Sequence, residues 1–281
     1  MKNYRSTIIT SRRNPLIARL RALSTKKGRE EASLLLLEGT HLLQEALKTN
    51  YFPKEIIATD SWIRKYKNIL ESTLNPFHLY EVNDSVLKAS LTTVNPDGVA
   101  SLYPLTGLPK VKPKSNFILA LYRVQDPGNL GNLFRIALAA DIELLLIAGG
   151  VDPLNQKVLR SSSGAVLHLP YERFSETEKE NLEYLFEKLS VAKDQGFQII
   201  GTAVSSEEEL RDVIPYWEID WNQPTILLLG NEGSGLDQLL MDCCTSVVTL
   251  PHSASVESLN VAAASVPLLL ERRRATMSNS V

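Results

Sequence analysis

The chain has 281 residues, of which 44% are hydrophobic and 22% charged, and its formal net charge is −2. This composition is ordinary for a globular protein, and the length allows one large or two modest domains. The longest apolar runs, such as 144–148 and 226–229, are too short to span a bilayer, and no apolar secretory segment begins the chain. Cys243 and Cys244 are adjacent, which argues against a mutual disulfide and favours reduced thiols. We therefore expect a cytoplasmic protein with no membrane segment.

The small net charge hides an asymmetry along the chain. Residues 1–110 carry 16 Lys and Arg against 10 Asp and Glu, whereas residues 111–281 carry 14 against 22. The first 29 residues hold nine basic side chains and no acidic one. Such a basic end indicates contact with a polyanion such as RNA or DNA, although a solvated helix face is an equally good interpretation. An Arg-rich start is also typical of an organelle transit peptide, but a helix with core residues begins by Asn14 and leaves little room for one.

Helices and strands alternate in the first hundred residues. Leu16, Ile17, Leu20 and Leu23 recur at helical spacing and predict a helix over 14–23. The elements expected after it are a strand over 33–38, a helix over 41–47, strands over 55–59 and 77–82, a helix over 84–90 and a strand over 98–103. We therefore predict a small α/β domain over residues 11–103 and a Pro- and Lys-rich linker over 104–115.

The remainder, residues 116–274, alternates more regularly. The elements expected here are strands over 116–121, 143–147, 166–169, 197–203, 226–229 and 246–250, and helices over 129–140, 155–161, 176–196, from 237, and over 259–274. Strands that alternate with helices predict an α/β domain whose mainly parallel sheet is covered on both faces.

Three polar segments interrupt the apolar sequence of this second domain. They are Asp126-Pro-Gly-Asn-Leu-Gly131, which leads into the helix that carries Arg135, Leu229-Gly-Asn-Glu-Gly-Ser-Gly235, and Val256-Glu-Ser-Leu-Asn-Val261. Ser258 and Asn260 can cap the helix that follows, and its Ala, Ser and Val residues favour close packing. Polar caps at a crowded helix start can bind a small polar ligand.

The glycine-rich segment and the arginine each allow two interpretations. The segment lacks the Lys-Ser/Thr of a phosphate-binding loop and the glycine order of a dinucleotide site, so a structural turn explains it by itself. Glu232 would repel phosphate but suits a hydroxyl, an amino group or an arginine. Asn129, Asn132 and Arg135 line one side of a helix start. A lone arginine is usually a surface residue, but the apolar neighbours of Arg135 favour a pocket edge.

Together the three segments resemble the three motifs of the SpoU (TrmH) family of RNA ribose 2′-O-methyltransferases, in the SPOUT superfamily. The resemblance covers residues 116–274, and Leu250-Pro251 belongs to the third motif. Residues 11–103, with Ser11-Arg-Arg-Asn-Pro-Leu16 and Leu37-Glu-Gly-Thr-His-Leu-Leu-Gln-Glu-Ala46, resemble the family's N-terminal substrate-binding domain of the L7Ae/L30e type.

The resemblance implies a C-terminal trefoil knot that binds S-adenosylmethionine, and a homodimer that packs around the knot. The implied cofactor-binding residues are Thr202, Ala203, Gly230, Leu250 and Leu259. The implied catalytic residues are Arg135, Asn129, Glu232, Ser258 and Asn260. Arg160 and Ser162 match a segment on the RNA side, and Arg12, Arg13 and Arg29 belong to the basic N-terminus that we expect to contact RNA.

The residues and the resemblance together favour methylation of large-subunit ribosomal RNA. The alternatives are methylation of tRNA, a non-catalytic RNA-binding factor in ribosome assembly, and a nucleotide-binding metabolic enzyme. The intact catalytic set argues against the assembly factor, and the missing phosphate-binding and dinucleotide motifs argue against the metabolic enzyme. The four histidines are scattered and no Cys/His ligand spacing occurs, so we expect no metal. Two features depart from the family pattern. His252 stands where the family more often has an apolar residue, and the turn at 161–163 is more polar than usual.

Overall fold

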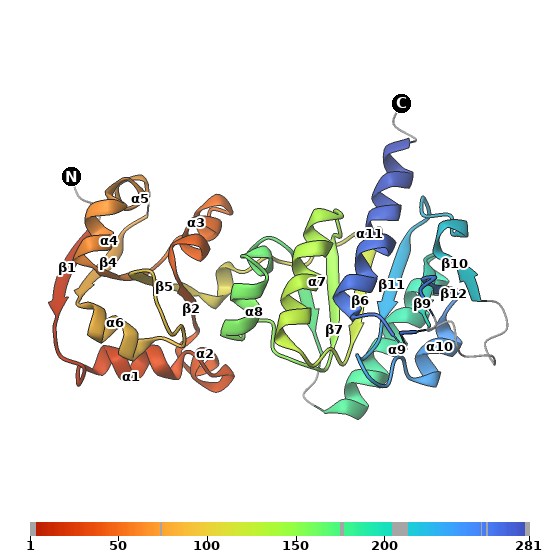
Figure 1. The fold of residues 1–281 in the computed structure, drawn as a ribbon, viewed down its shortest axis with the longest axis horizontal. Helices are drawn as coiled ribbons and strands as arrows, with labels where there is room; N and C mark the ends of the chain where they lie inside the picture. The colour runs from red at the N-terminus through yellow and green to blue at the C-terminus, as the bar shows by residue number, and fades with distance from the viewer. Residues whose placement is uncertain are drawn as a thin grey trace. The chain divides into compact units, whose positions relative to one another are not determined.

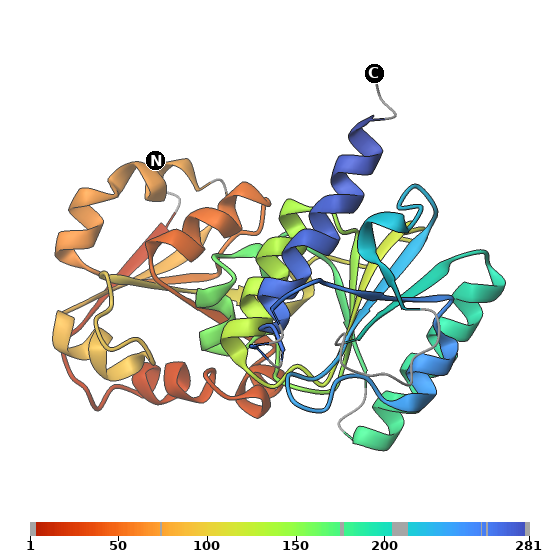
Figure 2. The same cartoon turned by 45° about the vertical axis from the view of Figure 1, so that its right-hand side comes forward.

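The computed structural model describes residues 4–73, 75–174, 177–203, 213–253, 255–256 and 258–278. The chain divides into two compact units. Unit 1 contains the described residues up to Leu108 together with Asp152–His168, and unit 2 contains Pro109–Val151 and the described residues from Leu169 onward. Figures 1 and 2 show both units as ribbons.

Unit 1 is built on a mixed five-stranded sheet with the order β1-β4-β3-β5-β2. Its strands are β1 (Tyr4–Ile9), β2 (Leu34–Glu38), β3 (Glu55–Thr59), β4 (Phe77–Val82) and β5 (Val99–Pro104). Strands β1, β4 and β3 run parallel to one another, and β5 is antiparallel to both β3 and β2. Every residue of β2 except Leu34 is buried, which explains its uninterrupted leucine run.

Helices cover both faces of this sheet (Figure 1). They are α1 (Pro15–Ala22), α2 (Lys26–Ala32), α3 (Thr40–Lys48), α4 (Asp60–Lys65), α5 (Lys67–Ser72) and α6 (Asp84–Ser90). Helix α8 (Gln156–Ser161) packs beside the edge strand β2, and η1 (Leu105–Gly107) and η2 (Ala165–Leu167) are single 3₁₀ turns. On one face, Leu20 of α1 and Val86 of α6 pack on Leu36, Ile57 and other strand residues. Helices α3 and α4 pack against β2, β5 and β3.

Unit 2 is built on a seven-stranded sheet with the order β10-β12-β9-β11-β6-β7-β8. Its strands are β6 (Phe117–Tyr122), β7 (Leu144–Ala148), β8 (Tyr171–Arg173), β9 (Gln198–Thr202), β10 (Val213–Pro215), β11 (Thr225–Leu229) and β12 (Ser246–Thr249). All six pairs of neighbouring strands are parallel. The predicted α/β fold with a mainly parallel sheet is therefore confirmed.

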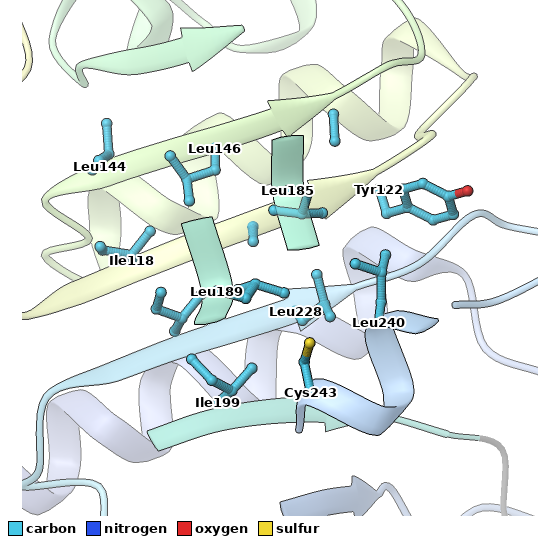
Figure 3. Packing of buried hydrophobic residues seen from close by; sticks show 13 residues of the cluster. Ile118, Tyr122, Leu144, Leu146, Leu185, Leu189, Ile199, Leu228, Leu240 and Cys243 are labelled. Atoms are coloured by element: carbon cyan, nitrogen blue, oxygen red, sulfur yellow. The ribbon is translucent and has the colours of Figure 1, made fainter. Parts of the chain in front are cut away.

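The buried strands of unit 2 contribute side chains to both faces of the sheet. The helices are α7 (Pro127–Ala139), α9 (Glu178–Asp194), α10 (Gln238–Cys243) and α11 (Val261–Ser278), with the 3₁₀ turn η3 (Tyr216–Glu218). Figure 3 shows Leu185 and Leu189 of α9, with Cys243 of α10, packed on Ile199 and Leu228. The alternate strand residues point to the other face, where α7 and α11 pack on each other. Among the described residues, no helix combines the length and apolar character needed to cross a bilayer.

Most predicted elements are present within one or two residues of their expected ends. The strand predicted over 166–169 is wrong, because Ala165–Leu167 form the turn η2 and the next strand begins only at Tyr171. Val166 and Leu167 are buried, so their apolar character reflects burial in a turn. The start predicted for the long helix, residue 176, lies outside the described residues.

Candidate active site

The three polar segments of unit 2 follow the carboxyl ends of three parallel strands of one sheet. The first connects β6 to α7, the second follows β11, and the third lies between β12 and α11. Strand β11 lies between β6 and β9, and β12 lies on the other side of β9. Parallel strands end at the same edge of a sheet, and ligands bind there in open α/β folds. The sheet order therefore brings segments together that are more than a hundred residues apart in the sequence.

Side-chain hydrogen bonds join one residue from each segment. Asn129 Nδ2 donates to Glu232 Oε1 at 3.0 Å, and Asn260 Nδ2 donates to Asn129 Oδ1 at 2.8 Å. Glu232 also accepts from the main-chain N–H groups of Gln125 and Asp126, each at 3.2 Å. Three of the predicted catalytic residues therefore form one continuous polar chain.

Helix capping fixes the first and third segments in place. Asp126 Oδ1 accepts from the Asn129 N–H at 2.8 Å at the start of α7, and Pro127 occupies the first helical position. Asn260 Oδ1 accepts from the N–H groups of Ala262 and Ala263 at 3.0 and 3.2 Å. Because the Asn260 oxygen caps α11, its amide nitrogen is left to face Asn129.

The glycine-rich second segment folds back on itself. Asn231 and Gly235 exchange two main-chain hydrogen bonds, of 2.9 and 3.1 Å, and Asn231 Nδ2 donates to the Arg123 carbonyl at 2.8 Å. A Cβ on Gly230 would lie 2.3 Å from the Gly235 carbonyl carbon, so the backbone leaves room only for glycine. This tight turn holds Glu232 against the first segment.

The environment of Glu232 keeps its carboxylate ionised. Partial burial alone would raise the pKa of Glu232, but the hydrogen bonds from Asn129, Gln125 and Asp126 outweigh it, so the pKa lies below its ordinary value. A carboxylate with a lowered pKa is a weak proton acceptor. Glu232 is better suited to orient Asn129 than to remove a proton.

A cavity of about 400 Å³ lies beside this chain. All five residues predicted to bind the cofactor line it, together with Glu232 and Ser258; the five are Thr202, Ala203, Gly230, Leu250 and Leu259. Its volume falls in the range of about 300–1,000 Å³ that small-molecule sites occupy. The main chain at Gly230 and the apolar walls at Leu229 and Leu268 fit an adenosine with a short polar chain.

Arg135 lies two turns further along α7 than Asn129, and its side chain is exposed. It does not belong to the cavity lining, whereas Ser258 does. The structure thus brings Asn129, Glu232 and Asn260 into contact, places Ser258 at the cavity, and leaves Arg135 on the helix surface.

The predicted RNA-binding residues occupy different environments. Arg12 and Arg13 are exposed in the turn before α1. Ser162 is fully buried and donates to the Leu159 carbonyl at 3.0 Å. The Arg160 side chain is 38% exposed, and it pairs with Glu38.

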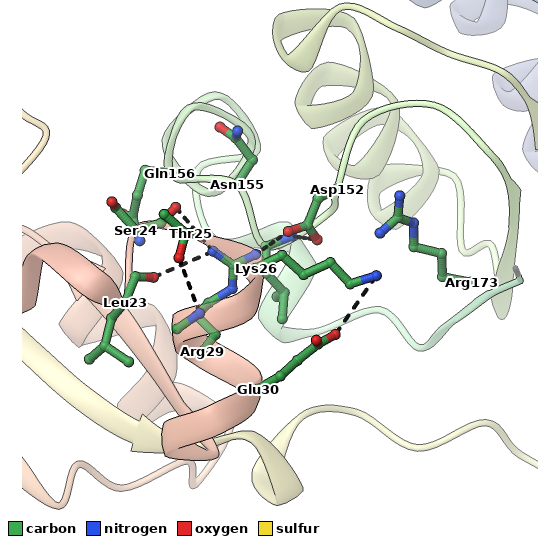
Figure 4. Close-up of polar contacts among 12 residues, drawn as sticks. Leu23, Ser24, Thr25, Lys26, Arg29, Glu30, Asp152, Asn155, Gln156 and Arg173 are labelled. Atoms are coloured by element: carbon green, nitrogen blue, oxygen red, sulfur yellow. Dashed lines mark hydrogen bonds and ion pairs between the residues drawn. The ribbon is translucent and has the colours of Figure 1, made fainter. Parts of the chain in front are cut away.

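Arg29 is buried in unit 1, with its side chain 3% exposed. Its guanidinium forms an ion pair with Asp152 and donates to the carbonyls of Ser24, at 3.2 Å, and Leu23, at 3.4 Å (Figure 4). These contacts give Arg29 a structural position in which its guanidinium is not accessible to RNA.

Sequence reasoning missed some polar contacts of the site. The main-chain N–H groups of Gln125 and Asp126 hold Glu232, and Asn231 braces the glycine-rich turn. Any residue type can supply a main-chain N–H group, so the sequence does not reveal these donors. Asn231 lies inside the glycine-rich motif, and its role in the turn is predictable from there. Among the described residues, no group of three or more His, Cys, Asp or Glu is placed to hold a metal ion.

Comparison with known proteins agrees with this geometry. Residues 116–269 match the SpoU rRNA Methylase family, and residues 14–101 match the MRM3-like substrate binding domain. The crystal structure of an AdoMet-bound rRNA methyltransferase from Sinorhizobium meliloti superposes with a TM-score of 0.76 at 27% identity, covering 96% of this chain and 98% of that one. Fold and site therefore define a SPOUT methyltransferase whose methyl donor is S-adenosylmethionine.

Two relatives share nearly the whole chain. An uncharacterized tRNA/rRNA methyltransferase of Synechocystis sp. is 39% identical over 95% of this chain and 93% of its own length. The 23S rRNA (guanosine(2553)-2′-O)-methyltransferase RlmP of Bacillus subtilis is 32% identical over 94% and 98%. The chain belongs to the SpoU rRNA methylase family.

Proposed function

We propose that this chain transfers a methyl group to one ribose 2′-hydroxyl of 23S ribosomal RNA. The observation that carries the proposal is the hydrogen-bonded chain Glu232–Asn129–Asn260 beside the 400 Å³ cavity. The similarity to RlmP over almost its entire length supports both the ribose 2′-hydroxyl as the methylated group and large-subunit RNA as the substrate. The match of residues 14–101 to a substrate binding domain supports an RNA substrate.

When bound, the methyl donor would supply a sulfonium-bound methyl group for in-line attack by the ribose oxygen, and it would leave as a neutral thioether. The hydroxyl proton would pass to a phosphate oxygen of the RNA. Alignment can account for about 7–11 kcal/mol of the barrier in favourable cases. Asn129 and Asn260, each fixed by its hydrogen bonds, orient the reacting hydroxyl. Arg135 stabilises the alkoxide that develops, because a guanidinium stays cationic and has no acceptor atom with which to act as the base. Ser258 completes the polar wall of the cavity.

The cofactor is held by the five lining residues named above, largely through main-chain groups. Thr202 ends β9, Ala203 comes directly after it, and Gly230 follows β11, so all three lie at the carboxyl edge of the sheet, where the cavity is. Leu250, directly after β12, and Leu259, in the third segment, also line the cavity. The RNA contacts are proposed at Arg12, Arg13 and Arg160.

The proposed domains follow the sequence: an RNA-binding domain over 11–103, a linker over 104–115 and the methyltransferase domain over 116–274. The two family matches, at 14–101 and 116–269, support these limits. Residues 152–168 lie within the match to the SpoU methylase family, although they pack in unit 1.

We further propose a knotted C-terminus and a homodimer. After β12 at one side of the sheet, the chain returns to α11, which packs on α7. Leu138 of α7, with Val266 and Leu270 of α11, exposes apolar side chains. Val266 and Leu270 are four residues apart and so share a helix face, which a second copy can cover. A cytoplasmic location accords with an RNA substrate.

A test starts from methyl transfer with tritiated S-adenosylmethionine to total RNA from cells that lack this protein. We expect label in 23S ribosomal RNA and its loss in Arg135→Ala. Near-full activity of Arg135→Lys would argue against the alkoxide role. Label in tRNA would favour the second candidate, which the tRNA/rRNA name of the Synechocystis relative keeps open. RNA binding with no transfer would indicate an assembly factor.

A further inference from the structure

The cavity of unit 2 contains one titratable side chain to which the proposed reaction gives no role. His252 follows Leu250-Pro251 after β12, is half-buried and lines the cavity of about 400 Å³. The described residues that line this cavity include no Lys or Arg. His252 is therefore the one side chain among them that can carry a positive charge.

One ring nitrogen of His252 is already committed. Nδ1 lies 2.7 Å from the Leu250 carbonyl oxygen. A carbonyl oxygen can only accept, so Nδ1 carries a proton and the ring is tied to its own main chain. Within the described part of the chain, Nε2 has no hydrogen-bond partner. This nitrogen accepts a hydrogen bond when the ring is neutral and donates one when the ring is protonated.

Most neutral side-chain donors of the cavity are already in use. Four of them donate to a main-chain carbonyl or to another side chain of unit 2. They are Thr202 Oγ1, Asn231 Nδ2, Ser234 Oγ and Gln238 Nε2. Ser258, the remaining one, is proposed above for the polar wall of the reaction site. An anionic group of a ligand in this cavity therefore has His252 as its available side-chain donor.

The charges of the cofactor divide between the two titratable groups of the cavity. S-adenosylmethionine carries a sulfonium, an amino group and a carboxylate. Glu232 is ionised because the hydrogen bonds that it accepts lower its pKa, so it attracts the two cationic groups and repels the carboxylate. Protonated His252 has the opposite effect on each. A charge-assisted hydrogen bond from an imidazolium to a carboxylate is also stronger than a neutral one.

We infer that His252 binds the carboxylate of the methionine part of S-adenosylmethionine and takes up a proton from solvent when the cofactor binds. The inference rests on the proposed cofactor site. The proton goes to Nε2, while Nδ1–H continues to donate to the Leu250 carbonyl. Among the described lining residues, Glu232 is the other group that titrates, and its negative charge also favours the protonated ring. From α10, Gln238 lines the cavity and bonds to Asp242, a further negative charge.

Cofactor affinity then depends on pH. Histidine changes its charge between about pH 5 and pH 8. A carboxylate partner favours the protonated ring in the complex, so the added affinity is present at low pH and is lost as pH rises. We expect wild-type affinity for S-adenosylmethionine to fall about five- to tenfold more than that of His252→Gln between about pH 6 and pH 8. Glutamine keeps a neutral donor at this position but does not titrate.

The test is calorimetric titration of the full chain with S-adenosylmethionine, without RNA, at about pH 7 in two buffers of different ionisation enthalpy. The difference in heat gives the number of protons taken up. The amino group of the cofactor titrates at a pKa of about 8, and comparison with His252→Gln removes that contribution. His41→Gln is the matched control, because His41 is exposed on α3 of unit 1. We expect the wild type and His41→Gln to take up more protons than His252→Gln.

A decarboxylated cofactor tests the same contact without changing the protein. It should bind the wild type and His252→Gln with equal affinity and equal proton uptake. Equal uptake of S-adenosylmethionine-linked protons by the wild type and His252→Gln would overturn the inference and leave the proposed function in place. Proton release would overturn it as well, and would indicate that a neutral ring accepts from the adenine amino group. A wild type that binds no S-adenosylmethionine would overturn the proposed cofactor site together with the inference.

Discussion

Asn129 Nδ2 donates to Glu232 Oε1 at 3.0 Å and so joins the first and second polar segments of unit 2 across 103 residues. The Asn129 amide also accepts from Asn260, so its orientation is fixed from two sides. An aspartate at position 129 would face Glu232 with a like charge. We expect Asn129→Asp to lose about a hundredfold in kcat/KM through misalignment, while cofactor affinity remains near that of the wild type. Steady-state kinetics and calorimetric titration with S-adenosylmethionine would separate the two effects.

The lowered pKa of Glu232 makes a pH-dependent contribution to stability. Because the folded pKa lies below the ordinary value of 4.5, the contribution is present above pH 4.5 and is lost as pH falls through the folded pKa. Glu232→Gln removes this component. Chemical denaturation from about pH 7 to about pH 3 should show a gap between wild type and variant that closes as pH falls. A constant gap would contradict the hydrogen-bonded carboxylate.

Gly230 and Gly233 lie in the same turn but differ in the space around them. A Cβ on Gly230 would meet the main chain of Gly235 at 2.3 Å, whereas one on Gly233 would meet only Asn231 Oδ1 at 3.6 Å. We expect Gly230→Ala to cost about 1–3 kcal/mol of stability and to weaken cofactor binding about tenfold. Gly233→Ala should leave both near wild type. Equal effects of the two substitutions would show that the turn is not packed in this way.

The Arg29–Asp152 ion pair makes Arg29 a structural residue. Arg29→Ala would leave a partly buried carboxylate without its partner, and we expect a loss of about 3–5 kcal/mol in the free energy of unfolding. Lys27, on the same helix, pairs with Glu31 in solvent at 3.8 Å. Lys27→Ala should change stability by no more than about 0.5 kcal/mol. Chemical denaturation of both variants decides the point, and a stable Arg29→Ala would return Arg29 to the RNA-binding candidates.

The dimer proposal is tested on the exposed apolar face of α7 and α11. A charge at Leu270 could not be covered by a second copy without a large desolvation cost. We expect Leu270→Glu to be monomeric in sedimentation equilibrium. The control is Leu239→Glu, which changes an exposed leucine on α10 and should leave the molecular mass of the assembly in solution unchanged. A wild type that is itself monomeric would contradict the proposal.

The sequence predicted the parallel sheet and the three segments because both depend on local patterns. Apolar strand runs and capping residues can be seen directly in β6, β11 and α7. Strand β1 was missed because it is an edge strand with four consecutive exposed residues, and therefore has no apolar pattern. Helix α2 was missed because a Thr25 cap and two i, i+4 ion pairs stabilise it, while its one buried residue is Arg29.

Contacts between residues far apart in the chain could not be predicted from the sequence. Arg29 reads as one more basic residue in a basic terminus, and its partner Asp152 lies 123 residues away. The buried Glu38 carboxylate likewise binds Thr92, Thr93 and Arg160. A carboxylate at the end of a leucine-rich strand was visible in the sequence, but its hydrogen-bond donors were not.

We propose that the polar chain beside the cavity directs methyl transfer to a ribose oxygen. The most direct measurement is nucleoside mass spectrometry of 23S ribosomal RNA methylated by the purified protein, with the modified position mapped by resistance to alkali. We expect one 2′-O-methylated nucleotide, which Asn129→Asp should form about a hundredfold more slowly than the wild type. A methyl group on a base, or an unchanged rate of methylation by the variant, would show that the polar chain does not direct the transfer.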